Sequence, residues 1–133
     1  MPEPYSAKYT SEYLRQEQDI PVLIQQVVRL LVLNILIGGG PDLAKTPWLK
    51  PLGQGLWEFR IGGSVHSVLK RAGVESPSRL GNQKILIRVF CAFEEEGVLL
   101  IGCYNKIRFG GGRPQSLAIT RARKVLLTFR EGR

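Results

Sequence analysis

The stretch KILIRVFCAFEEEGVLLIGCYNK, residues 84–106, decides the fold, and the other elements can be placed around it. Its two apolar runs, Ile85 to Phe93 and Val98 to Tyr104, are separated by three glutamates and a glycine. Two apolar, β-prone runs around a short polar turn predict a β-hairpin. Arg88 interrupts the first run, where burying a charge is costly unless an anion or a partner satisfies it. Arg88 is therefore the first candidate functional residue.

The charge of the chain favours an anionic partner. The sequence has 133 residues, which is the size of one domain, and we expect a single domain over residues 1–133. Its formal net charge is +8, and from Lys106 onward eight basic residues face one acidic residue. A basic end on a nearly neutral body is typical of a surface that binds phosphate, with nucleic acid as the first case. A basic but inert surface is the alternative.

Two helices are expected before the hairpin. Ser11 can cap a short helix through Gln18, and Asp19 can cap a longer helix from Pro21 to Ile37 that ends before three glycines. The apolar part of the longer helix, about 16 residues, falls short of the roughly 20 needed to span a bilayer. Residues 1–13 also lack the apolar core of a signal peptide. We therefore expect a cytoplasmic protein that does not enter a membrane.

The longer helix is apolar over a broad surface, which needs covering on more than one side. Either the sheet and the C-terminal helix cover it completely, or a protein partner covers part of it.

The remaining segments complete the expected sheet. Residues 1–10 are either a frayed end or a short edge strand, and the proline-rich residues 41–51 are expected to form a loop. Leu56 to Ile61 alternates like a strand, which puts Glu58 and Arg60 on its polar face. Residues 62–83, which include His66, are predicted to be a mobile insertion.

The last helix is expected between Pro114 and Gly132, with an apolar stripe toward the core. This order of elements predicts an α+β fold, in which an antiparallel sheet is flanked by two N-terminal helices and a C-terminal helix.

Two cysteines lie on the two arms of the hairpin. In a simple register Cys91 faces Leu100 and Cys103 faces Arg88, so the cysteines do not oppose each other. We interpret them as reduced, buried side chains. Their spacing is not that of a metal site, and no metal and no cofactor are predicted.

Four segments of the chain follow one another in a characteristic order. They are GLWEFRI (55–61), IRVFCAF (87–93), LLIGCYNK (99–106) and AITRARKVL (118–126). Their order and spacing resemble the RelE/HigB family of type II toxins, most closely its phage-derived HigB-like branch, over roughly residues 11–130. In this chain Asn105 stands where the branch often has an acid, and Ile101 stands where other members have histidine.

The resemblance implies a RelE-like fold and a function as the toxin of a type II toxin–antitoxin system. Such a toxin is an endoribonuclease, an mRNA interferase that cleaves mRNA, usually on the ribosome, and is neutralised by an antitoxin, here expected to be a helix-turn-helix protein. The resemblance carries Arg60, Arg88 and Lys106 onto positions of active-site cations, and Lys50 onto a weaker match.

RNA supplies its own nucleophile, the 2′-OH, so cleavage of this kind needs no metal. On this hypothesis Arg60 and Arg88 hold the scissile phosphate. Lys106 or Lys50 acts as the base, and Tyr104 or a second cation acts as the acid. Four further cations are expected to bind RNA, namely Arg108, Arg113, Arg121 and Lys124.

Three alternatives remain open from the sequence. Arg60 and Arg88 could form internal pairs with Glu58 or Glu75. A ParE-like relative would instead inhibit DNA gyrase by protein contact. A non-catalytic relative of prophage origin would bind RNA without cleaving it.

Overall fold

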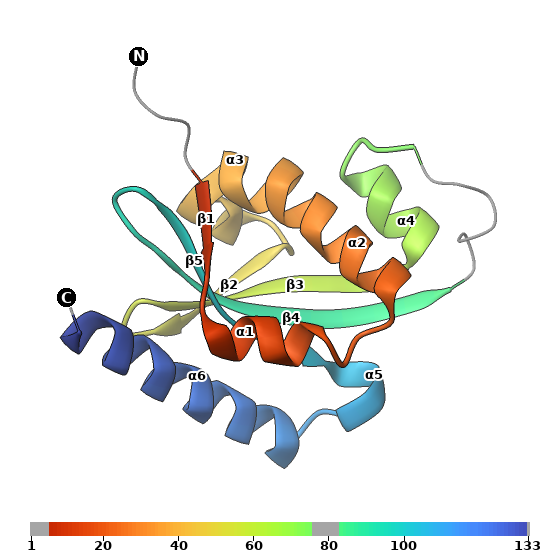
Figure 1. The fold of residues 1–133 in the computed structure, drawn as a ribbon. Helices are drawn as coiled ribbons and strands as arrows, with labels where there is room; N and C mark the ends of the chain where they lie inside the picture. The colour runs from red at the N-terminus through yellow and green to blue at the C-terminus, as the bar shows by residue number, and fades with distance from the viewer. Residues whose placement is uncertain (1–5, 76–82, 133) are drawn as a thin grey trace.

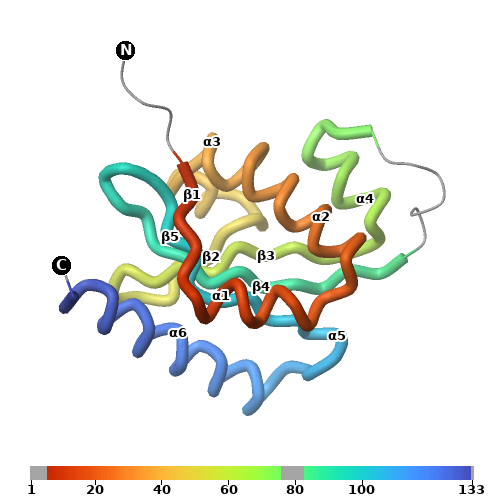
Figure 2. The backbone as a smooth tube through the Cα atoms, viewed as in Figure 1, coloured from red at the N-terminus to blue at the C-terminus, as the bar shows by residue number. Residues whose placement is uncertain are grey.

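Helices lie on both faces of a five-stranded sheet in the computed structural model, which describes residues 6–75 and 83–132 (Figures 1 and 2). The strand order is β1-β5-β4-β3-β2. The strands are β1 (Ser6–Tyr9), β2 (Leu49–Gly53), β3 (Leu56–Ser64), β4 (Lys84–Phe93) and β5 (Gly97–Asn105). The helices are α1 (Ser11–Glu17), α2 (Val22–Leu31), α3 (Ile37–Gly39), α4 (Val65–Arg71), α5 (Lys106–Phe109) and α6 (Arg113–Glu131), with helical turns η1 (Val32–Leu36) and η2 (Gly40–Lys45). The predicted α+β class, with a sheet flanked by two N-terminal helices and a C-terminal helix, is confirmed.

The hairpin at the centre of the sheet is confirmed. β4 and β5 pair antiparallel, and the Glu94 amide donates to the Gly97 carbonyl across the turn at 2.8 Å. β3 lies on the other side of β4, and β2 pairs antiparallel with β3. The hairpin therefore supplies the two inner strands to which the outer strands add.

The N-terminal segment forms an edge strand, which is one of the two alternatives that the sequence left open. β1 pairs with β5 in parallel, so four strands are antiparallel and one edge is parallel. The side chain of Thr10, and not that of Ser11, caps α1, because its Oγ1 accepts a hydrogen bond from the Tyr13 amide at 3.1 Å.

The long apolar helix begins one residue later than expected. Pro21 is its N-cap residue, and no side chain caps it, so the prediction that Asp19 caps this helix was wrong. The helix continues through a π-helical segment, η1, to Gly39 in α3, which is two residues beyond the expected end at Ile37. Gly40 then adopts a φ of +57°, which is in the left-handed region that glycine enters without strain.

The helical run from Val22 to Lys45 is longer than the sequence suggested. It contains 24 residues, and a window of 18 residues within it has a mean hydropathy of 1.9, with one third of that window buried. By length and composition alone it could cross a membrane, which corrects the expectation that this segment is too short. This is weak evidence, because core helices of folded domains pass the same test.

Two apolar clusters divide the interior by sheet face. One cluster joins α2, α4 and the core-facing residues of β3, β4 and β5, including Val28, Phe59 and Val89. The other joins α6 to the opposite face through Ala122, Leu126 and their neighbours. α6 is therefore separated from α2 by the sheet, and the expectation that the C-terminal helix helps to cover α2 was wrong (Figure 1).

Short elements replace several expected loops. The loop predicted over residues 41–51 contains η2 and the first residues of β2. The insertion predicted over residues 62–83 contains the end of β3 and the helix α4, on which His66 is exposed. Residues 76–82 of that insertion lie outside the described part of the chain. The helix α6 was predicted within one residue at each end.

Candidate functional site

Three of the five residues predicted to be catalytic lie in one row across the sheet, and a fourth, Lys50, lies on the same face in a neighbouring row. Arg60 of β3 pairs with Arg88 of β4, and Arg88 pairs with Tyr104 of β5. Lys50 of β2 pairs with Glu58, which lies two residues before Arg60 on the same strand. Cross-strand partners, and residues two apart on one strand, share a face of the sheet. We call Lys50, Glu58, Arg60, Arg88 and Tyr104 the polar row.

Arg88 is buried and incompletely satisfied. Its residue exposure is 6%, and among the described residues it is the one buried basic side chain. Its Nη1 donates to the Ile87 carbonyl at 3.3 Å, whereas its buried Nε has no hydrogen-bond partner. Burial and then the neighbouring charge of Arg60 lower the pKa of Arg88, while Glu58 opposes that shift. A buried donor without a partner indicates a group that an anion could complete.

Glu58 occupies the centre of the polar row, although sequence reasoning treated it only as a possible internal partner. Its exposure is 3%. One carboxylate oxygen lies 3.5 Å from the Arg60 Nε and 3.7 Å from the Arg88 Nε. The other accepts from the Gln115 side chain of α6 at 3.4 Å. The internal contact with Glu58 is therefore present, and one carboxylate faces two guanidinium groups.

A β-bulge aligns Tyr104 with Arg88. Phe90 pairs with Gly102 but Cys91 pairs with Leu100, so Ile101 is an extra residue in β5. The predicted pairing of Cys91 with Leu100 is confirmed. The predicted pairing of Cys103 with Arg88 was wrong, because the extra residue moves Cys103 opposite Val89 and into the core.

Tyr104 is held by a short helix. Its hydroxyl donates a short hydrogen bond to the Gly110 carbonyl, and its ring centroid lies 5.9 Å from that of Phe109. Burial raises the pKa of Tyr104, because it disfavours the charged phenolate. Asn105 starts this helix, α5, because its side-chain oxygen accepts from the Ile107 and Arg108 amides at 3.2 and 3.4 Å. The position where the resembling branch often has an acid thus carries a helix cap.

Lys106 of α5 comes near the polar row on its α6 side. A Cβ added to Gly111 would lie 3.7 Å from both the Lys106 Nζ and the Gln115 Oε1, so the ammonium lies close to the residue that contacts Glu58. Lys50 is exposed on the edge strand β2. Lys50 is thus the cross-strand partner of Glu58, and Lys106 lies near Gln115, whose side chain contacts Glu58.

The four cations predicted to bind RNA do not form one cluster. Arg108 covers the Phe109 ring, with its Cζ 5.1 Å from the ring centroid, and Arg113 is exposed at the start of α6. Arg121 forms an ion pair with Glu12 of α1 at 2.7 Å. Lys124 is exposed farther along α6, beside the β2–β3 turn. Arg113 lies two residues before Gln115, which contacts Glu58, whereas Arg121 and Lys124 lie farther along the same helix.

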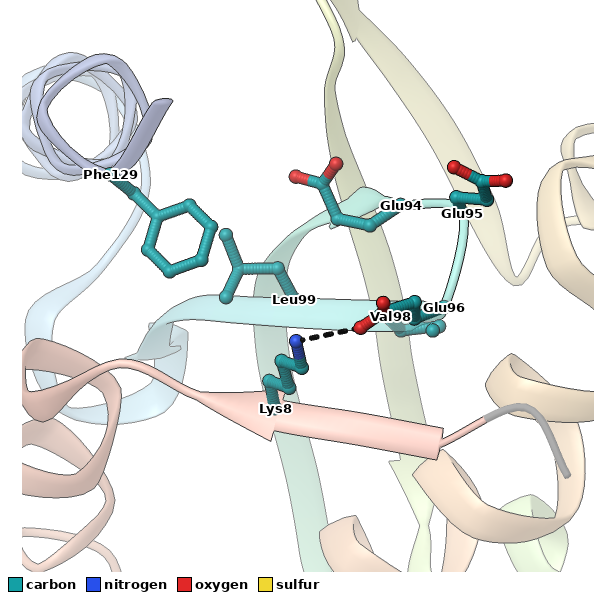
Figure 3. Close-up of a pocket in the computed structure, with 8 residues that line it drawn as sticks. Lys8, Glu94, Glu95, Glu96, Val98, Leu99 and Phe129 are labelled. Atoms are coloured by element: carbon teal, nitrogen blue, oxygen red, sulfur yellow. Dashed lines mark hydrogen bonds and ion pairs between the residues drawn. The ribbon is translucent and has the colours of Figure 1, made fainter. Parts of the chain in front are cut away.

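A hollow of about 300 Å³ lies elsewhere, at the hairpin turn (Figure 3). Glu94, Glu95 and Glu96 line it together with Lys8 and Phe129, and Lys8 forms an ion pair with Glu96 at 3.2 Å. Three carboxylates against one ammonium repel phosphate, so this hollow does not fit the predicted substrate. In the described part of the chain, no group of three or more His, Cys, Asp or Glu side chains could hold a metal ion.

Comparison with known proteins gives one structural likeness. No protein-family model matches the sequence, and no curated protein matches it either. Among solved structures, a chain of the RelBE2 toxin–antitoxin complex from Mycobacterium tuberculosis is similar, with a TM-score of 0.45 and 14% sequence identity. The match covers 77% of this chain and 99% of that chain. A likeness of this size assigns no role to any residue.

Proposed function

We propose that this chain is the toxin of a type II toxin–antitoxin system, an endoribonuclease that cleaves mRNA on the ribosome without a metal ion or cofactor. One observation carries the proposal. The buried Arg88, whose Nε has no hydrogen-bond partner, lies beside Arg60 on a sheet face of a strongly basic protein. Two guanidinium groups and one carboxylate leave a net positive charge where a phosphate could bind.

The polar row can support attack of the 2′-OH on the adjacent phosphate. Arg60 and Arg88 would bind the non-bridging oxygens and stabilise the charge that develops on them. Lys50 or Lys106 would accept the proton of the 2′-OH, because Lys50 is the cross-strand partner of Glu58 and Lys106 lies near Gln115, which contacts Glu58. The Tyr104 hydroxyl can donate to the leaving 5′-oxygen if it leaves the Gly110 carbonyl, as a weaker acid than an ordinary phenol because burial raises its pKa.

The proposed partners follow from the resemblance in sequence. They are a cognate helix-turn-helix antitoxin, mRNA and the ribosome, in the cytoplasm and away from membranes. Arg108 and Arg113 would extend the contact with the RNA backbone next to the polar row. Arg121 and Lys124 would add affinity for ribosomal RNA at a greater distance.

The test compares wild type with two variants that each remove one positive charge. Arg88→Ala removes the buried guanidinium, and Arg71→Ala removes an exposed one that stacks on Trp48, in the other apolar cluster. Each protein is induced in cells while growth is followed and new RNA 5′ ends are mapped. For wild type and Arg71→Ala we expect growth arrest and new RNA 5′ ends that recur at a fixed position within codons. We expect neither for Arg88→Ala.

Melting temperatures of the purified proteins show whether Arg88→Ala is folded, and Arg60→Ala provides a second, exposed position in the same row. A folded Arg88→Ala protein that still cleaves RNA would contradict the assignment. Growth arrest without new RNA ends would favour a protein target such as gyrase. RNA binding without cleavage or arrest would favour the non-catalytic alternative.

A further inference from the structure

Another hollow, of about 400 Å³, lies between the C-terminal half of α6 and the turn that joins β2 to β3 (Figure 1). We call it the α6 hollow. Its lining contains three basic side chains, Arg123, Lys124 and Arg130, together with Gln54, Leu56, Leu126 and Leu127. Among the described residues no acidic side chain lines it, and Glu131 near the end of α6 lies outside the lining. Three positive charges around one hollow attract an anion.

Backbone carbonyls hold the two arginines in place without neutralising them. The two terminal nitrogens of Arg123 donate to the carbonyls of Gly53 and Leu52. Arg130 donates through its Nη1 to the Gln54 carbonyl at 3.5 Å. A guanidinium has five N–H donors, so each arginine keeps its charge and further donors for a ligand.

The turn that supplies these carbonyls has an unusual backbone. Gly53, Gln54 and Gly55 have φ values of +88°, +56° and +82°, and Gln54 is the one described residue other than glycine with a positive φ. A Cβ added to Gly55 would lie 2.9 Å from both terminal nitrogens of Arg130. The turn therefore packs closely against Arg130, and the cations are positioned before any ligand binds.

The α6 hollow and the polar row lie on one face of the sheet, near different ends of α6. Leu56 lines the hollow and lies two residues before Glu58 on β3, so the two residues share a face. The helical rise of 1.5 Å per residue puts Leu127 about 18 Å along α6 from Gln115, which contacts Glu58. An RNA that reaches the polar row can therefore reach the hollow through a different phosphate.

We propose that the α6 hollow binds phosphate groups of an RNA backbone, at a site separate from the one where RNA is cut. The choice of RNA rests on the proposed function, whereas binding in the hollow requires no cleavage. Lys124 and the remaining donors of Arg123 and Arg130 contact the phosphate oxygens. The strand of mRNA and folded ribosomal RNA both present this chemistry, and the experiment separates them.

The experiment measures how RNA binding depends on salt for Lys124→Ala combined with Arg130→Ala. The matched control is Lys70→Ala combined with Arg71→Ala, an exposed pair of cations on α4 at the other face of the sheet. In both pairs the arginine donates to a backbone carbonyl. One arm uses a 2′-O-methylated oligonucleotide, which lacks the nucleophile for cleavage, and the other uses sedimentation with purified ribosomes.

We expect the Lys124 and Arg130 double variant to bind more weakly at low salt. The slope of the logarithm of the association constant against the logarithm of salt concentration should become shallower by about 1.4, for two lost contacts with single-stranded RNA. The control pair should keep the wild-type slope. A change with the oligonucleotide indicates an mRNA strand in the hollow, and a change with ribosomes alone indicates ribosomal RNA.

Melting temperatures separate binding from support of the fold. If the double variant is less stable, Lys124→Ala alone removes only an exposed side chain and should still lower the slope by about half as much. Wild-type slopes for the folded variants in both arms, or an equal loss in the control pair, would refute the site. Because neither arm requires cleavage, a wild type that yields no new RNA ends in cells would contradict the proposed function and leave this site standing.

Discussion

At the scale of single residues, the pair of Arg88 and Glu58 is the strongest constraint on function. Their closest charged atoms are 3.7 Å apart, which is too far for a hydrogen bond, although both side chains are buried. A buried donor left without a partner costs about 1–3 kcal/mol. A phosphate oxygen that reached the Arg88 Nε would remove this cost, which is a physical reason for anion binding at this residue.

Glu58 should stabilise the fold by compensating the buried charge of Arg88. We expect Glu58→Gln to lower the free energy of unfolding by about 3 kcal/mol, because it leaves a buried guanidinium uncompensated. Glu96→Gln, which breaks an exposed pair with Lys8, should cost less than about 1 kcal/mol. Urea denaturation of both variants provides the measurement.

A double variant checks the cause of that loss. In Glu58→Gln combined with Arg88→Met, no buried charge remains uncompensated, so most of the lost stability should return. If Glu58→Gln costs no more than Glu96→Gln, or if the double variant is no more stable than Glu58→Gln alone, then Glu58 does not compensate Arg88.

Part of the polar row could be predicted from the sequence. Strand alternation places Glu58 and Arg60 on one face, and the apolar run around Arg88 marks that arginine as unusual. The contact of Tyr104 with this row depends on the extra residue Ile101, and an apolar run carries no signal for a bulge. The central role of Glu58 depends on the packing of Gln115, which is 57 residues away in the sequence.

At the scale of elements, one glycine decides whether the edge strand β1 can pair with the hairpin. Gly97 pairs with Ser6, and a Cβ at Gly97 would lie 2.0 Å from the Ser6 carbonyl oxygen. Backbone cannot yield as a flexible side chain does, so β1 would have to move away. The parallel edge of the sheet therefore requires glycine at this position.

We expect Gly97→Ala to release β1 and to speed hydrogen exchange of the β5 amides that face it. The control is Gly38→Ala, which lies in α3 with nothing within 4 Å of the added Cβ. Alanine is favoured over glycine in helices by roughly 1 kcal/mol, so Gly38→Ala should raise the free energy of unfolding. Equal exchange rates in wild type and Gly97→Ala would show that β1 tolerates the side chain.

Elements whose apolar residues recur with a clear strand or helix period were predicted well, and short elements were not. The hairpin and α6 show sustained strand or helix patterns, so their ends were predicted within one residue. β2 contains Pro51, and α4 directly follows the two glycines of β3. Proline and glycine usually mark loops, and here packing against the sheet overrides that local preference.

At the scale of the whole molecule, the sheet separates two layers with different roles. α2 and α4 bury the larger apolar cluster on one face, and α6 covers only part of the other. α5 and the start of α6 lie on that second side of the sheet (Figure 1), and the contact of Glu58 with Gln115 of α6 puts the polar row on the same face. The proposed RNA contact is therefore confined to one side, and charges on the α2–α4 side should contribute little to it.

The salt dependence of RNA binding tests this one-sided arrangement. The logarithm of the association constant for single-stranded RNA falls with the logarithm of salt concentration, by about 0.7 for each phosphate contact. Arg113→Ala removes an exposed cation at the start of α6 and should reduce the slope by about that amount. Arg71→Ala removes a cation that stacks on Trp48, in the α2–α4 cluster, and should leave the slope unchanged. Fluorescence anisotropy of a labelled oligonucleotide at several salt concentrations gives both slopes, and equal reductions would indicate that positive charge attracts RNA from all sides.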